Sequence, residues 1–98
     1  MTPIKLAIEM ARAYALDTDA KGARLSRPQR EGIKAKLYAL QGTLTQDERE
    51  AVHAQIALLD NDADELAHVS PHHPDIPPVR AVQDELYALL SVPKRDRY

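Results

Sequence analysis

Carboxylates at alternate positions are the first feature of this sequence that could do chemistry. Asp60, Asp62 and Asp64 form a D-x-D-x-D run, which is the opening pattern of a calcium-binding loop. A complete loop of that kind has glycine at its sixth position and a glutamate at its twelfth, where this sequence has Glu65 and Pro71. The run therefore predicts an acidic surface rather than a calcium site.

Histidines are the second candidate for metal chemistry. His68, His72 and His73 lie close together, and imidazole is a common ligand of zinc and nickel. Pro71, however, breaks any helix that would bring His68 and His72 to one face, and no thiolate or carboxylate at ligand spacing completes a set. We therefore expect neither a metal nor any other cofactor.

Residues for covalent or acid–base catalysis are scarce. The chain has three serines, no cysteine and no glycine-rich phosphate loop. No pair of carboxylates stands in a setting that would plainly separate their pKa values, as a catalytic acid and base require. We therefore expect a protein that is not an enzyme and has no small-molecule substrate.

Charge is unevenly distributed along the 98 residues, although the net charge is only −2. Residues 43–75 hold eight Asp or Glu against one Lys or Arg, whereas residues 1–42 hold eight Lys or Arg against four. Spaced carboxylates can substitute for a row of phosphates. The acidic segment thus predicts a regulator or inhibitor that binds another protein, for example by blocking a nucleic-acid-binding surface as small phage or mobile-element inhibitors do. The residues expected on this partner-binding face are Asp47, Glu48, Glu50, Asp60, Asp62, Asp64 and Glu65.

Two alternatives stay open at this level. Arg27, Arg30 and Lys34 recur at spacings of three and four, with Arg24 before them, and such a stripe is typical of a DNA- or RNA-binding module. The basic stripe could instead pair with the acidic segment of the same chain or of another copy. A homodimeric structural or assembly component is the other alternative, because the first predicted helix is apolar around most of its circumference. Its dimer face would comprise Ile4, Ile8, Ala11 and Ala15.

Helix signals predict the scaffold that positions these groups. Capping boxes at 26–29 and 45–48 indicate helix starts, since Ser or Thr caps an N–H group while Gln or Glu returns a hydrogen bond. Apolar residues then recur every three to four positions. We expect an all-α, four-helix bundle-like domain with the first helix central. The predicted helices span about 3–17, 27–41, 46–69 and 78–92.

Glycine and proline predict where the helices stop. Gly42 is expected to end the second helix in the left-handed conformation, and the four prolines within 70–78 predict an extended connector before the last helix. Residues 93–98 are expected to form a loose basic tail of a single 1–98 domain. No apolar run is long enough for a membrane span, so we expect a cytoplasmic protein without membrane contact.

Overall fold

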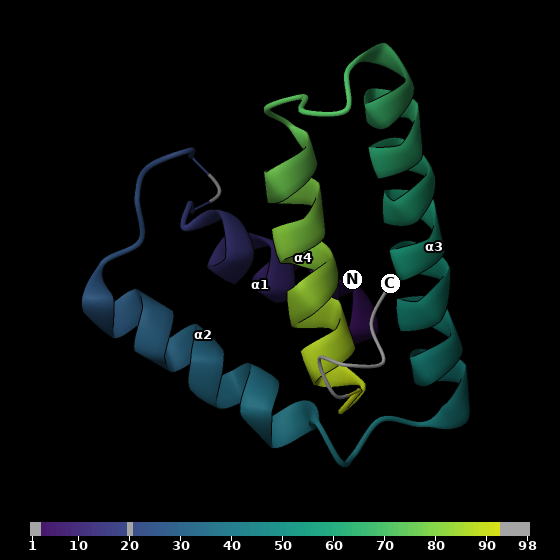
Figure 1. Ribbon diagram of the computed structural model, residues 1–98. Helices are drawn as coiled ribbons and strands as arrows, with labels where there is room; N and C mark the ends of the chain where they lie inside the picture. Colours follow the sequence, from purple (N-terminus) through teal and green to yellow (C-terminus); the bar gives the residue numbers. More distant parts are fainter. Residues whose placement is uncertain (1–2, 20, 93–98) are drawn as a thin grey trace.

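The computed structural model describes residues 3–19 and 21–92, and this part of the chain is all-helical (Figure 1). The predicted all-α, bundle-like fold is confirmed, and the first three helices begin and end within one residue of the predicted positions. The tail predicted at 93–98 lies outside the described residues. The four helices are α1 (Pro3–Leu16), α2 (Arg27–Leu40), α3 (Gln46–Val69) and α4 (Ile76–Leu89).

Local hydrogen bonds fix the starts of α2 and α3. The Ser26 side chain accepts a hydrogen bond from the Gln29 N–H at 3.3 Å, and the Gln29 side chain accepts one from the Ser26 N–H at 2.8 Å. Thr45 and Glu48 form the same reciprocal pair, at 3.2 Å and 2.8 Å. Each box satisfies N–H groups that the first helical turn leaves without a backbone acceptor. Both starts are therefore set by four consecutive residues of sequence.

The connector before α4 is shorter than the sequence predicts. Residues 70–75 are non-helical and contain hydrogen-bonded turns rather than one continuously extended run. Helix α4 begins at Ile76, so Pro77 and Pro78 lie in its first turn. Proline is tolerated there because the N–H groups of the first turn have no acceptor within the helix. The later prolines of 70–78 thus help to start α4.

Two helices are followed by residues with left-handed backbone, and neither residue is glycine. Asp17 follows α1 with a φ of 55°, and Ser91 lies just beyond α4 with a φ of 61°. The prediction for Gly42 is wrong, because its φ is not positive and α2 ends with a hydrogen bond from the Gln41 N–H to the Tyr38 carbonyl at 3.2 Å. Aspartate is one of the few non-glycine residues that tolerate the left-handed region.

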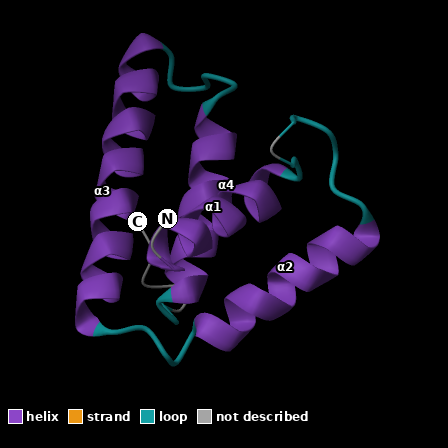
Figure 2. Ribbon diagram, turned by 180° about the vertical axis from the view of Figure 1, so that it is seen from behind, coloured by secondary structure: helices purple, strands orange, loops and turns teal. Residues whose placement is uncertain are grey.

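Helices α1 and α4 form the centre of the domain, and each packs against all the other helices. Helix α3 runs alongside α4, whereas α2 stands at the periphery on the other side (Figures 1 and 2). The chain has no Phe or Trp, so its core consists of Leu, Ile, Val and Ala. Two buried alanines of α1, Ala7 and Ala11, let this helix approach its neighbours closely. Helix α1 was predicted to be central, and it shares this position with α4. The buried core comprises Ala7, Ala11, Leu37, Val52, Ile56, Val82, Leu86, Leu89 and Leu90.

Candidate functional site

The outward side of α3 carries a continuous row of side chains that helix packing leaves accessible. Val52, Ile56 and Ala63 are buried and define the inward side. Successive residues of a helix lie about 100° apart around its axis. Other residues of α3 therefore form a second row along the helix, about 140° around the axis from these three buried residues. Every member of this row is exposed except for one half-buried alanine. We call it the outer α3 stripe: Asp47, Ala51, Ala54, Leu58, Asp62, Glu65 and Val69.

Two large apolar side chains stand out from this stripe. Leu58 is 59% exposed and Val69 is 79% exposed. They lie 11 residues apart, which is about three helical turns, and Asp62 and Glu65 lie between them. Apolar anchors flanked by polar groups are the composition expected of a protein–protein contact.

A hollow of about 330 Å³ adjoins the stripe at Asp62, between α1, α3 and α4. Apolar side chains from all three helices form much of its lining, and the ionisable groups in it are three carboxylates and one guanidinium. The hollow therefore combines an apolar surface with negative charge, as the stripe does. Its apolar lining includes Ile8, Leu16, Leu59, Val79 and Val82, and its ionisable groups are Glu9, Arg12, Asp62 and Asp75.

The seven acidic residues predicted for a partner-binding face are divided among several sides of α3. Asp60 and Asp64 lie about 120–160° around the helix from Leu58. Glu48 is committed to the capping box, and Glu50 accepts a hydrogen bond from the side chain four residues earlier. The three that share the outer α3 stripe are Asp47, Asp62 and Glu65.

Asp60 belongs to a polar bridge between α3 and α4. Arg80 Nη1 donates to Asp60 Oδ1 at 2.6 Å and to Gln83 Oε1 at 2.7 Å. Gln83 is fully buried, and its Nε2 donates to the Ile56 carbonyl at 3.0 Å. The hydrogen bond from Arg80 lowers the pKa of the Asp60 carboxyl, although partial burial opposes this effect. Asp60 therefore serves the packing of the chain itself.

The four predicted basic residues are brought together beside the end of α1. They line a hollow of about 690 Å³, together with one aromatic ring, one leucine and two carboxylates. Unlike the acidic set, they gather around one recess on one side of the domain. The lining residues are Tyr14, Asp17, Arg24, Leu25, Arg27, Arg30, Glu31 and Lys34.

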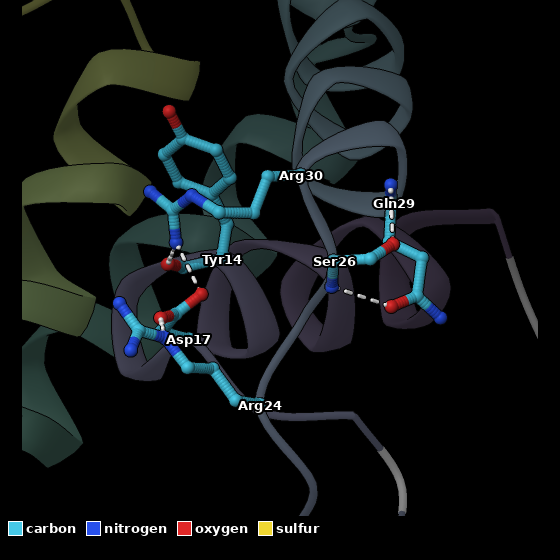
Figure 3. A network of polar contacts seen from close by, with 6 residues as sticks. All are labelled: Tyr14, Asp17, Arg24, Ser26, Gln29 and Arg30. Atoms are coloured by element: carbon cyan, nitrogen blue, oxygen red, sulfur yellow. Dashed lines mark hydrogen bonds and ion pairs between the residues drawn. The ribbon is translucent and has the colours of Figure 1, made fainter.

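Asp17 lies at the centre of this cluster, between two guanidinium groups (Figure 3). Its carboxylate accepts hydrogen bonds from Arg30 Nη1 at 2.8 Å and from Arg24 Nε at 3.0 Å. Arg30 also donates to the Tyr14 carbonyl at 3.2 Å, and its guanidinium lies 4.3 Å from the centre of the Tyr14 ring. The hydrogen bond from Arg30 is the main cause of a lowered pKa at the Asp17 carboxyl. The bonds also offset part of the cost of left-handed backbone at Asp17.

Lys34 and Arg27 are exposed cations of this cluster that do not contact Asp17. Arg27 Nε pairs with Glu31 at 3.2 Å one turn along α2, and both side chains are strongly exposed, so the pair contributes little. Lys34 forms no ion pair with any described residue. Within the described part of the chain, none of the ion pairs of this cluster reaches the acidic α3.

The predicted dimer face on α1 is packed inside the chain. Ala11 is fully buried, and Ile4, Ile8 and Ala15 are half-buried against the same core. These side chains therefore have neighbours from within one copy, and Ile8 also lines the hollow of about 330 Å³. Leu6, which is 50% exposed, is the large apolar side chain of α1 that stands outside.

The histidines do not assemble a metal site in the part of the chain that the structure describes, where no three His, Asp or Glu side chains could hold a metal ion together. His73 instead helps to shape the entry to α4, because its Nδ1 accepts a hydrogen bond from the Asp75 N–H at 3.1 Å. Within residues 3–19 and 21–92, no helix is both long enough and apolar enough to cross a membrane.

Sequence reasoning missed the exposed apolar and aromatic side chains. Leu58 and Val69 fall outside the inward apolar row of α3, and projecting the sequence at 100° per residue would have placed them on the outer side. Tyr38, one turn beyond Lys34 on α2, is 75% exposed. The helical periodicity of the sequence thus indicates which apolar side chains are exposed, whereas the charge pattern alone does not.

Fold and surfaces together define a small all-α module with two charged faces on different helices. Comparisons of the chain with protein-family models, with curated proteins and with solved structures found no match.

Proposed function

We propose that this chain is a non-enzymatic protein-binding module that regulates or inhibits a partner by covering a basic surface with the outer α3 stripe. The observation that carries the proposal is the exposure of Leu58 and Val69 on the same stripe as Asp62 and Glu65. Apolar anchors supply affinity when a partner buries them. Carboxylates beside the anchors select a partner with Lys or Arg at matching positions.

The size of the apolar contribution limits how such a partner must bind. Burying the exposed parts of Leu58 and Val69 contributes about 2–4 kcal/mol. Association costs about 4–15 kcal/mol of translational and rotational freedom. The partner must therefore also fill the hollow beside Asp62 and pair with the carboxylates. Ala51 and Ala54 favour a partner helix, because small side chains allow a close approach of two helices.

A second copy of the chain is a poor occupant of the same stripe. Packing Leu58 of one copy against Val69 of another across a two-fold axis centres the contact between positions 63 and 64. Asp62 of one copy then faces Glu65 of the other, and like charges repel across such a contact. A heterologous partner with positive charge avoids this repulsion. A surface that otherwise binds nucleic acid has the required charge.

Capture from lysate of the source cells tests the proposal when matched variants are compared. We expect the wild type to retain a basic protein that Leu58→Ser and the double variant Asp62→Asn/Glu65→Gln no longer retain. Asp64→Asn is the control for charge, because Asp64 is an exposed carboxylate on another side of α3. Leu6→Ser is the control for an exposed apolar side chain off the stripe. Capture that the stripe variants do not reduce, or no captured protein at all, would refute the proposal.

Light scattering over a range of protein and salt concentrations tests the exclusion of a second copy. We expect a monomer at every protein and salt concentration, because the carboxylates on the outer α3 stripes of two copies repel each other and the α1 face packs against the core of its own chain. A dimer that Leu58→Ser converts to monomer would contradict the proposal and assign the stripe to self-association.

A further inference from the structure

A straight row of exposed side chains also runs along α2. Arg27, Lys34 and Tyr38 lie within about 40° of one another around the helix and span about 16 Å of its length. Arg27 is 89% exposed, Tyr38 is 75% exposed, and Lys34 is exposed as well. Leu37 is the one buried residue of α2, so the helix is held along a single edge and its outer side is open. Its position at the periphery is visible in Figures 1 and 2.

Two hollows join along this row. The hollow of about 690 Å³ lies beside Arg27 and Arg30, and a second one of about 220 Å³ extends towards Tyr38 and α4. Tyr14 and Lys34 line both of them, so the two hollows adjoin at these side chains, and together we call them the trough. The trough begins among guanidinium groups, passes the ammonium group of Lys34 and ends at the exposed ring.

We infer that this trough binds a single-stranded segment of nucleic acid, with phosphates at Arg27 and Lys34 and one base stacked on Tyr38. A positively charged groove combined with an aromatic ring is how proteins hold single strands without reading their sequence. The ring is what favours nucleic acid over an acidic peptide, because a base offers a flat face for stacking. It also favours a single strand over a duplex, in which the bases are already stacked on one another.

Carboxylates in the trough limit the affinity. Asp17 neutralises part of the charge of Arg24 and Arg30, and a phosphate that reaches Arg27 must displace Glu31. A third carboxylate, that of Glu85, lines the hollow beside Tyr38 and lowers the positive charge there. The two phosphate contacts at Arg27 and Lys34 correspond to a slope of about −1.4 when log K is plotted against log salt for a single strand. The expected dissociation constant at low salt is about 10–100 µM, in the range of non-specific binding.

Fluorescence anisotropy of a labelled oligothymidylate of about 20 nucleotides, titrated with the full chain at several salt concentrations, tests the inference. Lys34→Gln should lower the magnitude of the salt slope by about 0.7, the share of one phosphate contact. Tyr38→Leu should raise Kd about five- to 150-fold, the range for loss of one stacked base, and leave the salt slope unchanged. Lys36→Gln is the matched control, because Lys36 is equally cationic and exposed but lies about 160° around α2 from Lys34.

Three results would overturn the inference. The first is the absence of binding at about 1 mM chain and low salt. The second is equal weakening by Lys34→Gln and Lys36→Gln, which would indicate attraction to the whole molecule. The third is equally strong binding of a duplex, or equal competition by poly-glutamate of the same charge, which would remove the role of the Tyr38 ring. All three substituted side chains are exposed, so the variants should retain the wild-type far-ultraviolet circular dichroism.

Discussion

Asp60 and Asp64 are chemically identical side chains one turn apart on α3, and they differ in their contacts. Arg80 Nη1 donates to Asp60 at 2.6 Å, whereas Asp64 has no ion-pair partner among the described residues. Changing each of them separately to Asn removes one charge and keeps the shape of the side chain. We predict that Asp60→Asn destabilises the fold and that Asp64→Asn does not.

The expected change in the free energy of unfolding is the sum of two opposing contributions, an attraction to Arg80 and a repulsion between the two aspartates. The side chains of Asp60 and Arg80 are 52% and 32% exposed, so their attraction is worth about 1 kcal/mol, the upper end for exposed pairs because Gln83 also holds Arg80 in place. Asp60 and Asp64 repel each other by about 0.3 kcal/mol, and either substitution relieves this. Asp60→Asn should therefore lower the free energy of unfolding by about 0.7 kcal/mol, and Asp64→Asn should raise it by about 0.3 kcal/mol. The difference of about 1 kcal/mol corresponds to about 4–8 °C in Tm.

The pH dependence of this difference identifies its cause. The pKa of Asp60 is lowered in the folded chain by its hydrogen bond with Arg80. Its contribution to stability is therefore complete above the unfolded-state pKa and is lost as the pH falls through the folded-state value. Urea denaturation followed by circular dichroism should thus separate wild type from Asp60→Asn at neutral pH. The two curves should converge as the pH falls below about 4, the ordinary pKa of an aspartate.

Two outcomes would refute this reasoning. Equal unfolding free energies for Asp60→Asn and Asp64→Asn at neutral pH would mean that the Arg80 bond contributes nothing measurable. A difference between wild type and Asp60→Asn that persists at the lowest pH where the chain still folds would mean that the substitution disturbs packing rather than charge.

Three further substitutions test other parts of the structure. Leu86→Ala in the fully buried centre should lower the free energy of unfolding by about 2–5 kcal/mol, and a urea midpoint that stays constant would contradict the core assignment. Thr45→Ala removes the cap of α3 and should cost about 1 kcal/mol, whereas an unchanged thermal midpoint would show that the capping box is dispensable. Asp17→Asn should destabilise the chain at neutral pH, and the effect should fade as the pH falls through the lowered pKa of this carboxyl. The same change removes negative charge from the trough, so it should tighten oligothymidylate binding in the anisotropy titration, and weaker binding would contradict the assigned role.

The helices could be predicted because their limits are set by neighbouring residues. The capping boxes at Ser26 and Thr45 act over four positions, so no knowledge of packing was needed to place α2 and α3. The left-handed backbone of Asp17 after α1 was not predicted, and the Asp17 side chain accepts bonds from Arg24 and Arg30, which lie beyond the turn. Such long-range compensation leaves no local pattern in the sequence.

The candidate surfaces could be predicted only where one helix determines them. Arg27, Arg30 and Lys34 line one hollow, because spacings of three and four keep side chains on one side of a helix. Asp60 and Asp62 are two positions apart, which places them on different sides of α3. That Asp60 meets Arg80 depends on how α4 packs beside α3, and sequence spacing contains no information about this contact.

The placement of the two proposed surfaces on separate helices makes their independence testable. No hydrogen bond or ion pair joins α2 to α3 in the described part of the chain, and residues without shared partners behave additively on substitution. Leu58→Ser should therefore abolish partner capture and leave oligothymidylate binding unchanged. Lys34→Gln should weaken oligothymidylate binding and leave partner capture unchanged. If each substitution instead impairs both activities while circular dichroism remains native, the stripe and the trough must act on one ligand. That ligand would be a complex of the partner with nucleic acid, because neither component alone satisfies the opposite charges of α2 and α3.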